Sequence, residues 1–194
     1  MRGTSLPELL VVLAILGLVF ALSVPALSEL LAEEGLQAAA REVSAILTAA
    51  RARAVFQGAE VGVKWISTGG DLVLSVHQDR NGNGVTTADV RNGVDRLVAG
   101  PYWLRGKYPG ISFSFVPGFD DLDPGGAPIG DLRDPLRFGR SDICSFSPLG
   151  KSSPGSVYLS NGKRRQAAVR ITPSNAKIQI FTWHGKSLKW IKRW

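Results

Sequence analysis

The chain has 194 residues, of which 44% are hydrophobic and 20% charged, and it carries 23 Lys and Arg against 16 Asp and Glu, a formal net charge of +7. This apolar content excludes a disordered protein. The single cysteine, Cys144, excludes an intrachain disulfide and a zinc site built from cysteine clusters. The positive balance is typical of proteins whose partner is a polyanion or an anionic membrane surface.

Charged and apolar residues are unevenly distributed along the chain. Residues 143–194 contain no Asp or Glu but hold ten Lys and Arg, which leaves 13 basic and 16 acidic groups, a net charge of −3, in residues 1–142. At the other end, Leu9–Leu22 has no polar side chain, and no charge lies between Glu8 and Glu29. The chain is therefore apolar at its start and basic at its end.

The apolar segment predicts a long helix. The twenty uncharged residues between Glu8 and Glu29 would span about 30 Å as an α-helix, enough to cross the hydrocarbon core of a bilayer. A secretory signal peptide, a membrane anchor and a buried core helix are the explanations open at this point. Glu8 fits a capping box that begins at Ser5, but a carboxylate beside a membrane-spanning helix needs a group that neutralises it.

The residues around Glu8 carry a resemblance to a known family. The sequence from Gly3 to Gly17 resembles the type III signal of type IV pilins and type II secretion pseudopilins. This resemblance implies a leader peptide of residues 1–3, which a prepilin peptidase removes by cleavage between Gly3 and Thr4, followed by N-methylation of Thr4. It also implies that Glu8 assists assembly by neutralising the N-terminus of a neighbouring subunit, and that Pro25 kinks the helix.

The helical pattern continues after this segment and becomes amphipathic. Apolar residues recur at steps of three and four as far as Ala54, with charged residues on the other faces, and Gly58 is suited to a C-cap. We therefore expect one helix from about residue 5 to 57. Its first half, residues 4–28, is predicted to span the membrane or lie in a filament core, and its second half, residues 29–58, to pack on the domain that follows.

Residues 59–194 form the predicted β domain, in which the hydrophobic period falls to two. One long helix followed only by strands predicts an α+β, pilin-like fold, with the helix packed on an antiparallel β domain of two sheets. The segment 117–135, rich in Pro, Gly and Asp, is predicted to be a mobile surface loop. The predicted strands are Val61–Ile66, Leu72–Gln78, Ile111–Val116, Ser156–Leu159, Ala167–Thr172 and Lys177–Trp183.

Further segments narrow the resemblance to the GspH/FimT branch of the pseudopilins. They are Ala49–Ala54 at the helix end, Asp79–Gly84 in an Asp/Asn/Gly turn, and Phe146–Gly150 followed by Gly155–Leu159. The family's C-terminal Gly-Arg-x-Arg motif is replaced here by Asn175–Gln179. The resemblance implies a non-enzymatic minor pseudopilin, a structural subunit of the type II secretion pseudopilus that needs no cofactor.

The resemblance also implies where the protein works and what it contacts. It implies a single-pass protein of the bacterial inner membrane, with its C-terminal domain in the periplasm, that joins a pseudopilus or pilus filament. Its implied partners are the prepilin peptidase, the inner membrane, and other pseudopilins or pilins contacted through the N-terminal helix. The alternative within the family is a FimT-like minor type IV pilin that binds DNA during uptake.

The basic C-terminal region leaves two interpretations open. Its cations can form an ordinary solvated or lipid-facing surface, or they can form a polyanion site. Residues 183–194 interleave three Trp with four cations, a composition that suits stacking on single-stranded nucleic acid and equally a membrane interface. The candidate DNA-binding residues are Lys163, Arg164, Arg165, Lys177, Lys186, Lys189, Lys192 and Arg193.

No metal site is expected, although the Asp/Asn/Gly turn is a candidate for calcium. Asp79, Asn81 and Asn83 occupy positions one, three and five of an EF-hand pattern. The acid that closes such a loop at position twelve is replaced by Val90, and Asp89 lies one residue early. A hydrated Asn-Gly turn explains the same residues without a metal.

The sequence contains no catalytic signature that we recognise. His77 and His184 are the only histidines, and each is expected on a strand surface. Cys144 is expected to be a small buried hydrophobic residue. We therefore expect no catalysis.

Overall fold

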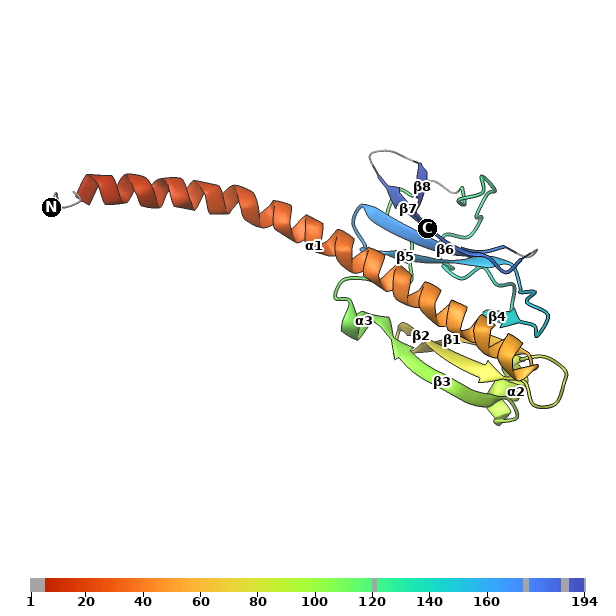
Figure 1. The fold of residues 1–194 in the computed structure, drawn as a ribbon. Helices are drawn as coiled ribbons and strands as arrows, with labels where there is room; N and C mark the ends of the chain where they lie inside the picture. Colours follow the sequence, from red (N-terminus) through yellow and green to blue (C-terminus); the bar gives the residue numbers. More distant parts are fainter. Residues whose placement is uncertain (1–5, 120–121, 173–174, 186–188, 194) are drawn as a thin grey trace.

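The computed structural model describes residues 6–119, 122–172, 175–185 and 189–193. One helix, α1 (Leu6–Gln57), runs for 52 residues without a break. Its first half projects away from the rest of the chain, and its second half lies along two β-sheets (Figure 1). α1 ends where Gly58 adopts a φ of +63°, the left-handed conformation that glycine accepts without a steric penalty and that commonly terminates helices.

Sheet A contains four antiparallel strands in the order β3-β2-β1-β4. β1 and β2 form a hairpin whose two-residue turn is Gly69-Gly70, and both glycines have the positive φ that such a turn requires. β3 is an edge strand, and register shifts interrupt its pairing with β2. The strands are β1 (Val61–Thr68), β2 (Asp71–Gln78), β3 (Arg96–Trp103) and β4 (Ile143–Phe146).

Sheet B is a four-stranded antiparallel meander in the order β5-β6-β7-β8. Two short helices lie outside the sheets: α2 (Thr87–Asn92) between β2 and β3, and α3 (Leu104–Lys107) directly after β3. The strands of sheet B are β5 (Gly155–Ser160), β6 (Arg165–Ile171), β7 (Ile178–His184) and β8 (Trp190–Lys192).

The second half of α1 supplies the centre of the core. It contacts strands of both sheets, which lie on either side of it in Figure 1. Small side chains of α1 such as Ala39, Ala40 and Ala50 are almost completely buried and allow the sheets to approach the helix backbone closely. One continuous hydrophobic cluster joins α1 to both sheets, and its members include Val43, Leu47, Val61, Val63, Leu74, Val157, Leu159, Ala167 and Val169.

The structure confirms the coarse fold class, an α+β chain with a long N-terminal helix and two antiparallel sheets. Five of the predicted strands correspond to β1, β2, β5, β6 and β7. The prediction of a strand over 111–116 was wrong, because only Ser112 forms a bridge, to Ser160, and no ladder follows. Ser112 and Ser114 instead share a hydroxyl contact of 2.9 Å, and Ser114 lies 2.6 Å from the Ser160 hydroxyl.

Candidate functional site

The first half of α1 presents an apolar surface to solvent. Every Leu, Ile, Val and Phe from Leu6 to Phe20 is exposed, the least exposed being Leu16 at 47%. Because these residues occur on every side of the helix, the surface is a cylinder rather than a stripe. Among the described residues, no helix has the length and hydropathy that a membrane crossing needs. An apolar area of this extent requires an apolar partner.

The processing and assembly residues predicted from the sequence lie in or before this half. Gly3 and Thr4 lie outside the described residues. Glu8 lies in the first turn of α1, where a carboxylate is favoured by the positive end of the helix dipole. The helix continues through residue 25, and Figure 1 shows α1 curving gently along its length. The kink at Pro25 stays a prediction, and α1 has no break at that residue.

The described cations of the C-terminal region lie in turns and at an edge of sheet B. Lys163 and Arg164 are exposed in the turn between β5 and β6, and Lys177 is exposed in the turn before β7. Lys189, Lys192 and Arg193 are exposed on or beside the edge strand β8. Lys186 lies outside the described residues. The two arginines within β6 differ from these cations because acidic residues from outside the sheet neutralise them.

Those two neutralised arginines lie on opposite faces of sheet B. Arg165 faces α1, and its Nη1 lies 2.8 Å from Oε1 of Glu33 on that helix. Arg170 points to the outer face, and its Nη1 lies 2.9 Å from Oδ2 of Asp123. The strands of sheet B contain no acid. Arg165, one of the candidate DNA-binding residues, is thus engaged in an internal ion pair and is only 23% exposed.

The outer face of sheet B is covered by the segment between α3 and β4. Phe119 from this segment packs edge-on against Trp183 at 5.2 Å and against Trp190 at 5.6 Å. The indole N–H of Trp190 donates to the carbonyl oxygen of Leu122 at 3.1 Å. Trp183 is 4% exposed, so it is unavailable for stacking on nucleic acid. The interpretation of the Trp-rich end as a stacking tail is therefore wrong for this residue.

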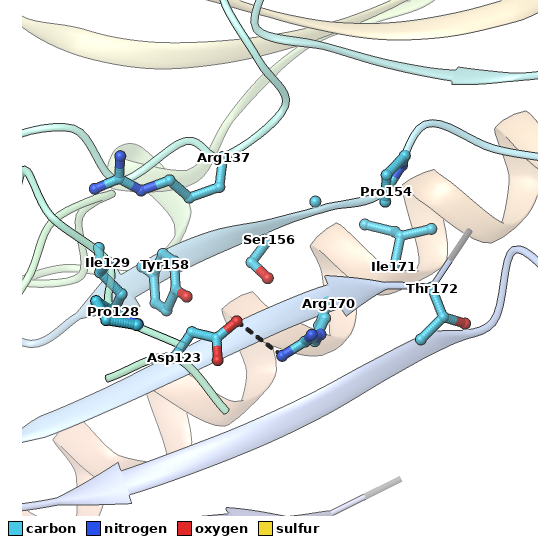
Figure 2. A pocket seen from close by; sticks show the side chains of 11 residues that line it. Asp123, Pro128, Ile129, Arg137, Pro154, Ser156, Tyr158, Arg170, Ile171 and Thr172 are labelled. Atoms are coloured by element: carbon cyan, nitrogen blue, oxygen red, sulfur yellow. Dashed lines mark hydrogen bonds and ion pairs between the residues drawn. The ribbon is translucent and has the colours of Figure 1, made fainter. Parts of the chain in front are cut away.

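The same segment borders an open cavity of about 320 Å³ against sheet B (Figure 2). Ser156 and Tyr158 of β5 and Arg170 of β6 lie along one side, and Asp123 meets Arg170 from the covering segment. Burial and the nearby Asp123 carboxylate raise the pKa of Tyr158 to about 12, so its hydroxyl remains protonated at neutral pH. This site was not predicted, because the Asp-rich composition of residues 117–135 does not indicate which residues the segment meets in the fold.

The calcium candidates fold into a loop that is closed by its own hydrogen bonds. Asp79 accepts hydrogen bonds from the backbone N–H groups of Asn81, Gly82 and Gly84, all at 2.9–3.0 Å. The Asn83 amide donates to Oδ2 of Asp89 at 3.0 Å. In the part of the chain that the structure describes, no group of three or more His, Cys, Asp or Glu is placed to hold a metal. The hydrogen bonds that Asp79 accepts are those of an Asx turn.

This loop covers the face of sheet A that points away from α1. Val85 packs against Gly62 of β1, where an added Cβ would lie 2.8 Å from Val85. Beneath it, the Nε2 atom of His77 lies 2.9 Å from the hydroxyl of Ser75. The prediction that His77 lies on a strand surface was wrong, because the residue is only 6% exposed. Burial lowers the pKa of His77, and the nearby Asp95, which acts to raise it, offsets this effect only in part.

Two further sequence predictions concern single side chains. Cys144 is buried in β4, as expected, and burial raises the pKa of its thiol. His184, at the end of β7, is partly buried rather than fully exposed. The buried Asp95, whose Oδ2 accepts the N–H of Thr86, was not predicted, because nothing in its sequence neighbourhood distinguishes it from a surface turn residue.

No protein-family model matches the chain, and neither the curated proteins nor the solved structures give a match to it. The features that bear on its function are the exposed apolar half of α1, the basic strands of sheet B and the cavity on the outer face of that sheet.

Proposed function

We propose that this chain is a minor pseudopilin of the GspH-like kind, a structural subunit of the type II secretion pseudopilus that assembles through α1. The observation that carries the proposal is the division of one continuous helix into two halves. The half up to Phe20 exposes apolar side chains on every side, whereas the half from Leu36 to Ala54 buries one face in the core. A helix built in this way joins a folded domain to an apolar environment outside it.

The size of the exposed apolar surface indicates what the environment must supply. Eleven large hydrophobic side chains between Leu6 and Phe20 are exposed. Full burial of a Leu, Ile, Val or Phe side chain contributes about 1.5–3 kcal/mol, so covering this half of α1 provides a large driving force for association. Copies of the same helix offer a matching apolar cylinder, and a lipid bilayer does so before assembly. In the proposed function, α1 lies first in the bilayer and then among the helices of other subunits in the filament.

Glu8 fits the same proposal. A carboxylate buried in a bundle of apolar helices is costly unless a cation lies beside it. After cleavage behind Gly3, the new N-terminus of a neighbouring subunit provides such a cation. The stagger between subunits is then determined by the pairing of Glu8 with that amine, because no other acid occurs before Glu29.

The attachment of α1 to both sheets suits a subunit that transmits force. Glu42 on α1 accepts hydrogen bonds from Lys107 Nζ and from the Tyr108 hydroxyl, both at 2.6 Å, next to sheet A. Glu33 binds Arg165 of sheet B. A displacement of α1 along the filament axis would therefore carry both sheets with it, which is the work proposed for a pseudopilus subunit.

The test of the proposal is the intact mass of the full chain recovered from the membranes of cells that contain a prepilin peptidase. We expect a mass that lacks Met1 to Gly3 and carries one additional methyl group, on Thr4. The same protein from cells without the peptidase should keep the three residues. Retention of Met1 to Gly3 in both cells would contradict the proposal, because assembly requires the processed N-terminus.

A second candidate function, DNA binding by a FimT-like minor pilin, is favoured by one observation. Lys163 and Arg164 are exposed beside a second hollow of about 330 Å³, and sheet B offers no acid to repel phosphate. Phosphate contacts give an affinity that falls steeply with salt concentration. A titration of the full chain with duplex DNA over a salt series, with Lys163→Gln/Arg164→Gln as the comparison, tests this function. Absence of binding at low salt eliminates it.

A further inference from the structure

The cavity on the outer face of sheet B has the chemistry of a binding site, and the filament role does not use it. Two arginines, Arg137 and Arg170, and one acid, Asp123, line it. The hydroxyls of Ser156, Tyr158 and Thr172 line it as well, as Figure 2 shows. Its volume of about 320 Å³ is at the lower end of the range for small-molecule sites, enough for a ligand of a few heavy atoms.

We propose that this cavity binds a carboxylate group, which Arg170 receives in competition with Asp123. Asp123 pairs with Arg170, and Arg137 lies 3.9 Å from Asp134, an acid outside the lining, so an incoming carboxylate gains its charge partner by replacing Asp123 at Arg170. Sheet B contributes no acid that would repel such a ligand. The carboxylate belongs either to a small free organic acid or to an acidic side chain that a partner protein inserts.

The contact between Arg170 and Asp123 is of a kind that a ligand can replace. Asp123 engages the guanidinium through one nitrogen, Nη1, whereas a carboxylate binds a guanidinium most strongly through two parallel hydrogen bonds. Asp123 also uses its other oxygen to accept the N–H groups of Gly125 at 2.7 Å and Ala127 at 2.9 Å. The turn around Asp123 therefore keeps its own hydrogen bonds when Arg170 changes partner.

The position of Arg170 limits how the ligand can approach. Gly125 lies directly against the guanidinium, and a Cβ at that position would be 2.3 Å from Nη1. The covering segment thus blocks one side of Arg170, and the ligand enters from the side of Ser156 and Tyr158. The Tyr158 hydroxyl, which lies beside that of Ser156, stays protonated at neutral pH, and we expect it to donate to the second oxygen of the bound carboxylate.

The aliphatic side chains of the lining determine which group can be attached to the carboxylate of the ligand. Ile129 flanks the polar groups, together with Pro128 and Pro154. This favours a carboxylate on a short aliphatic stem, such as a short-chain fatty acid or the end of a Glu side chain, over a phosphate dianion, which would need a second free cation.

The experiment measures binding by isothermal titration calorimetry to the full-length protein held in a non-ionic detergent, at constant ionic strength. The probes are butyrate, butyramide, and a capped short peptide containing one Glu together with its Gln counterpart. We expect butyrate or the Glu peptide to bind and the two uncharged probes to fail. Binding of butyrate identifies a free acid as the source, whereas binding of the Glu peptide alone identifies a partner's side chain.

Three variants make the result decisive. Arg170→Gln should weaken binding at least tenfold, and Asp123→Asn should tighten it severalfold because the internal competitor is gone. Tyr158→Phe keeps the ion pair and the ring packing, and should weaken binding about threefold; it replaces Arg170→Gln if that variant fails to fold. Arg133→Gln, a surface arginine that is 93% exposed, is the matched control and should leave affinity unchanged.

Two outcomes overturn the proposal. One is the failure of both butyrate and the Glu peptide to bind the wild-type protein. The other is an unchanged or weaker affinity in Asp123→Asn, which would show that Asp123 supports the cavity rather than competing for Arg170.

Discussion

Glu33 of α1 and Arg165 of β6 form an ion pair of 2.8 Å in which each side chain is 23% exposed. This pair joins the helix to the sheet that carries no acid of its own. The Nε atom of Arg165 is buried without a hydrogen-bond partner among the described residues, so the guanidinium relies on Glu33 for its neutralisation. This ion pair explains how sheet B, whose strands hold basic residues and no acid, can pack against α1.

We predict that Glu33→Gln lowers the free energy of unfolding by about 1–3 kcal/mol, because it leaves a mostly buried guanidinium without a counter-charge. Chemical denaturation of the full-length protein in detergent measures the change. Glu34→Gln, an exposed neighbour on the same helix, is the matched control and should shift stability by less than about 0.5 kcal/mol. Equal effects of the two substitutions would show that the Glu33–Arg165 pair contributes no stability.

Glu42 connects α1 to α3 and gives stability a dependence on pH. Burial raises the pKa of its carboxyl, but the hydrogen bonds from Lys107 and Tyr108 outweigh burial and bring the pKa below the ordinary value of 4.5. A group whose pKa is lower in the folded state stabilises the fold above its unfolded pKa and loses this contribution as the pH falls through the folded pKa.

We therefore predict that Glu42→Gln destabilises the protein at pH 7 and that its difference from the wild type shrinks below pH 4.5. Denaturant midpoints measured between pH 3 and pH 7 follow this difference. Tyr108→Phe removes one of the two hydrogen bonds to Glu42 and should show a smaller effect in the same direction. A difference that stays constant down to pH 3 would contradict the assigned role of the carboxylate.

The loop that contains the calcium candidates packs on β1, and substitution of Gly62 tests the contribution of this packing to stability. We predict that Gly62→Ala destabilises the protein by about 1–3 kcal/mol, because the new methyl group would lie 2.8 Å from Val85 and 3.0 Å from Ile143. Gly106→Ala in α3, where the methyl group meets no atom within 4 Å, is the control and should be neutral or slightly stabilising. Thermal unfolding compares the two, and a neutral Gly62→Ala would mean that the loop is not packed on β1.

The long helix could be predicted from the sequence because its signals are local. Twenty uncharged residues, an amphipathic repeat and Gly58 gave α1 almost its observed bounds, Leu6–Gln57. β3 was not predicted because Gly100 and Pro101 interrupt it, both residues that are typical of turns, and its side chains are mostly exposed. β4 and β8 were too short, at four and three residues, for an alternating pattern to be visible.

The candidate sites were harder to predict than α1, because they are formed by residues that are distant from one another in the sequence. The excess of cations after residue 143 was evident, but its partial neutralisation was not, because Glu33 and Asp123 reach Arg165 and Arg170 only through the tertiary fold. The alternation in residues 111–116 predicted a strand, but this segment pairs with sheet B only through the bridge from Ser112 to Ser160. The Asp-rich composition of 117–135 was the one available indication that an acid would meet the basic sheet.

The last prediction concerns Glu8 and follows from the proposed filament role. We predict that Glu8→Ala leaves the protein in the membrane fraction, because the apolar surface from Leu9 to Phe20 is unchanged, but reduces its incorporation into filaments at least tenfold. The reason is that a neighbouring N-terminal amine buried among apolar helices would lose its counter-charge, at a cost of several kcal/mol. Fractionation and shearing of cells that express the full machinery, followed by immunoblotting, measures both quantities. Glu34→Ala is the control, since Glu34 is exposed on the half of α1 that packs on the sheets. Normal incorporation of Glu8→Ala would refute the charge-pairing role while leaving the helix-mediated assembly to be tested by substitutions in Leu9–Phe20.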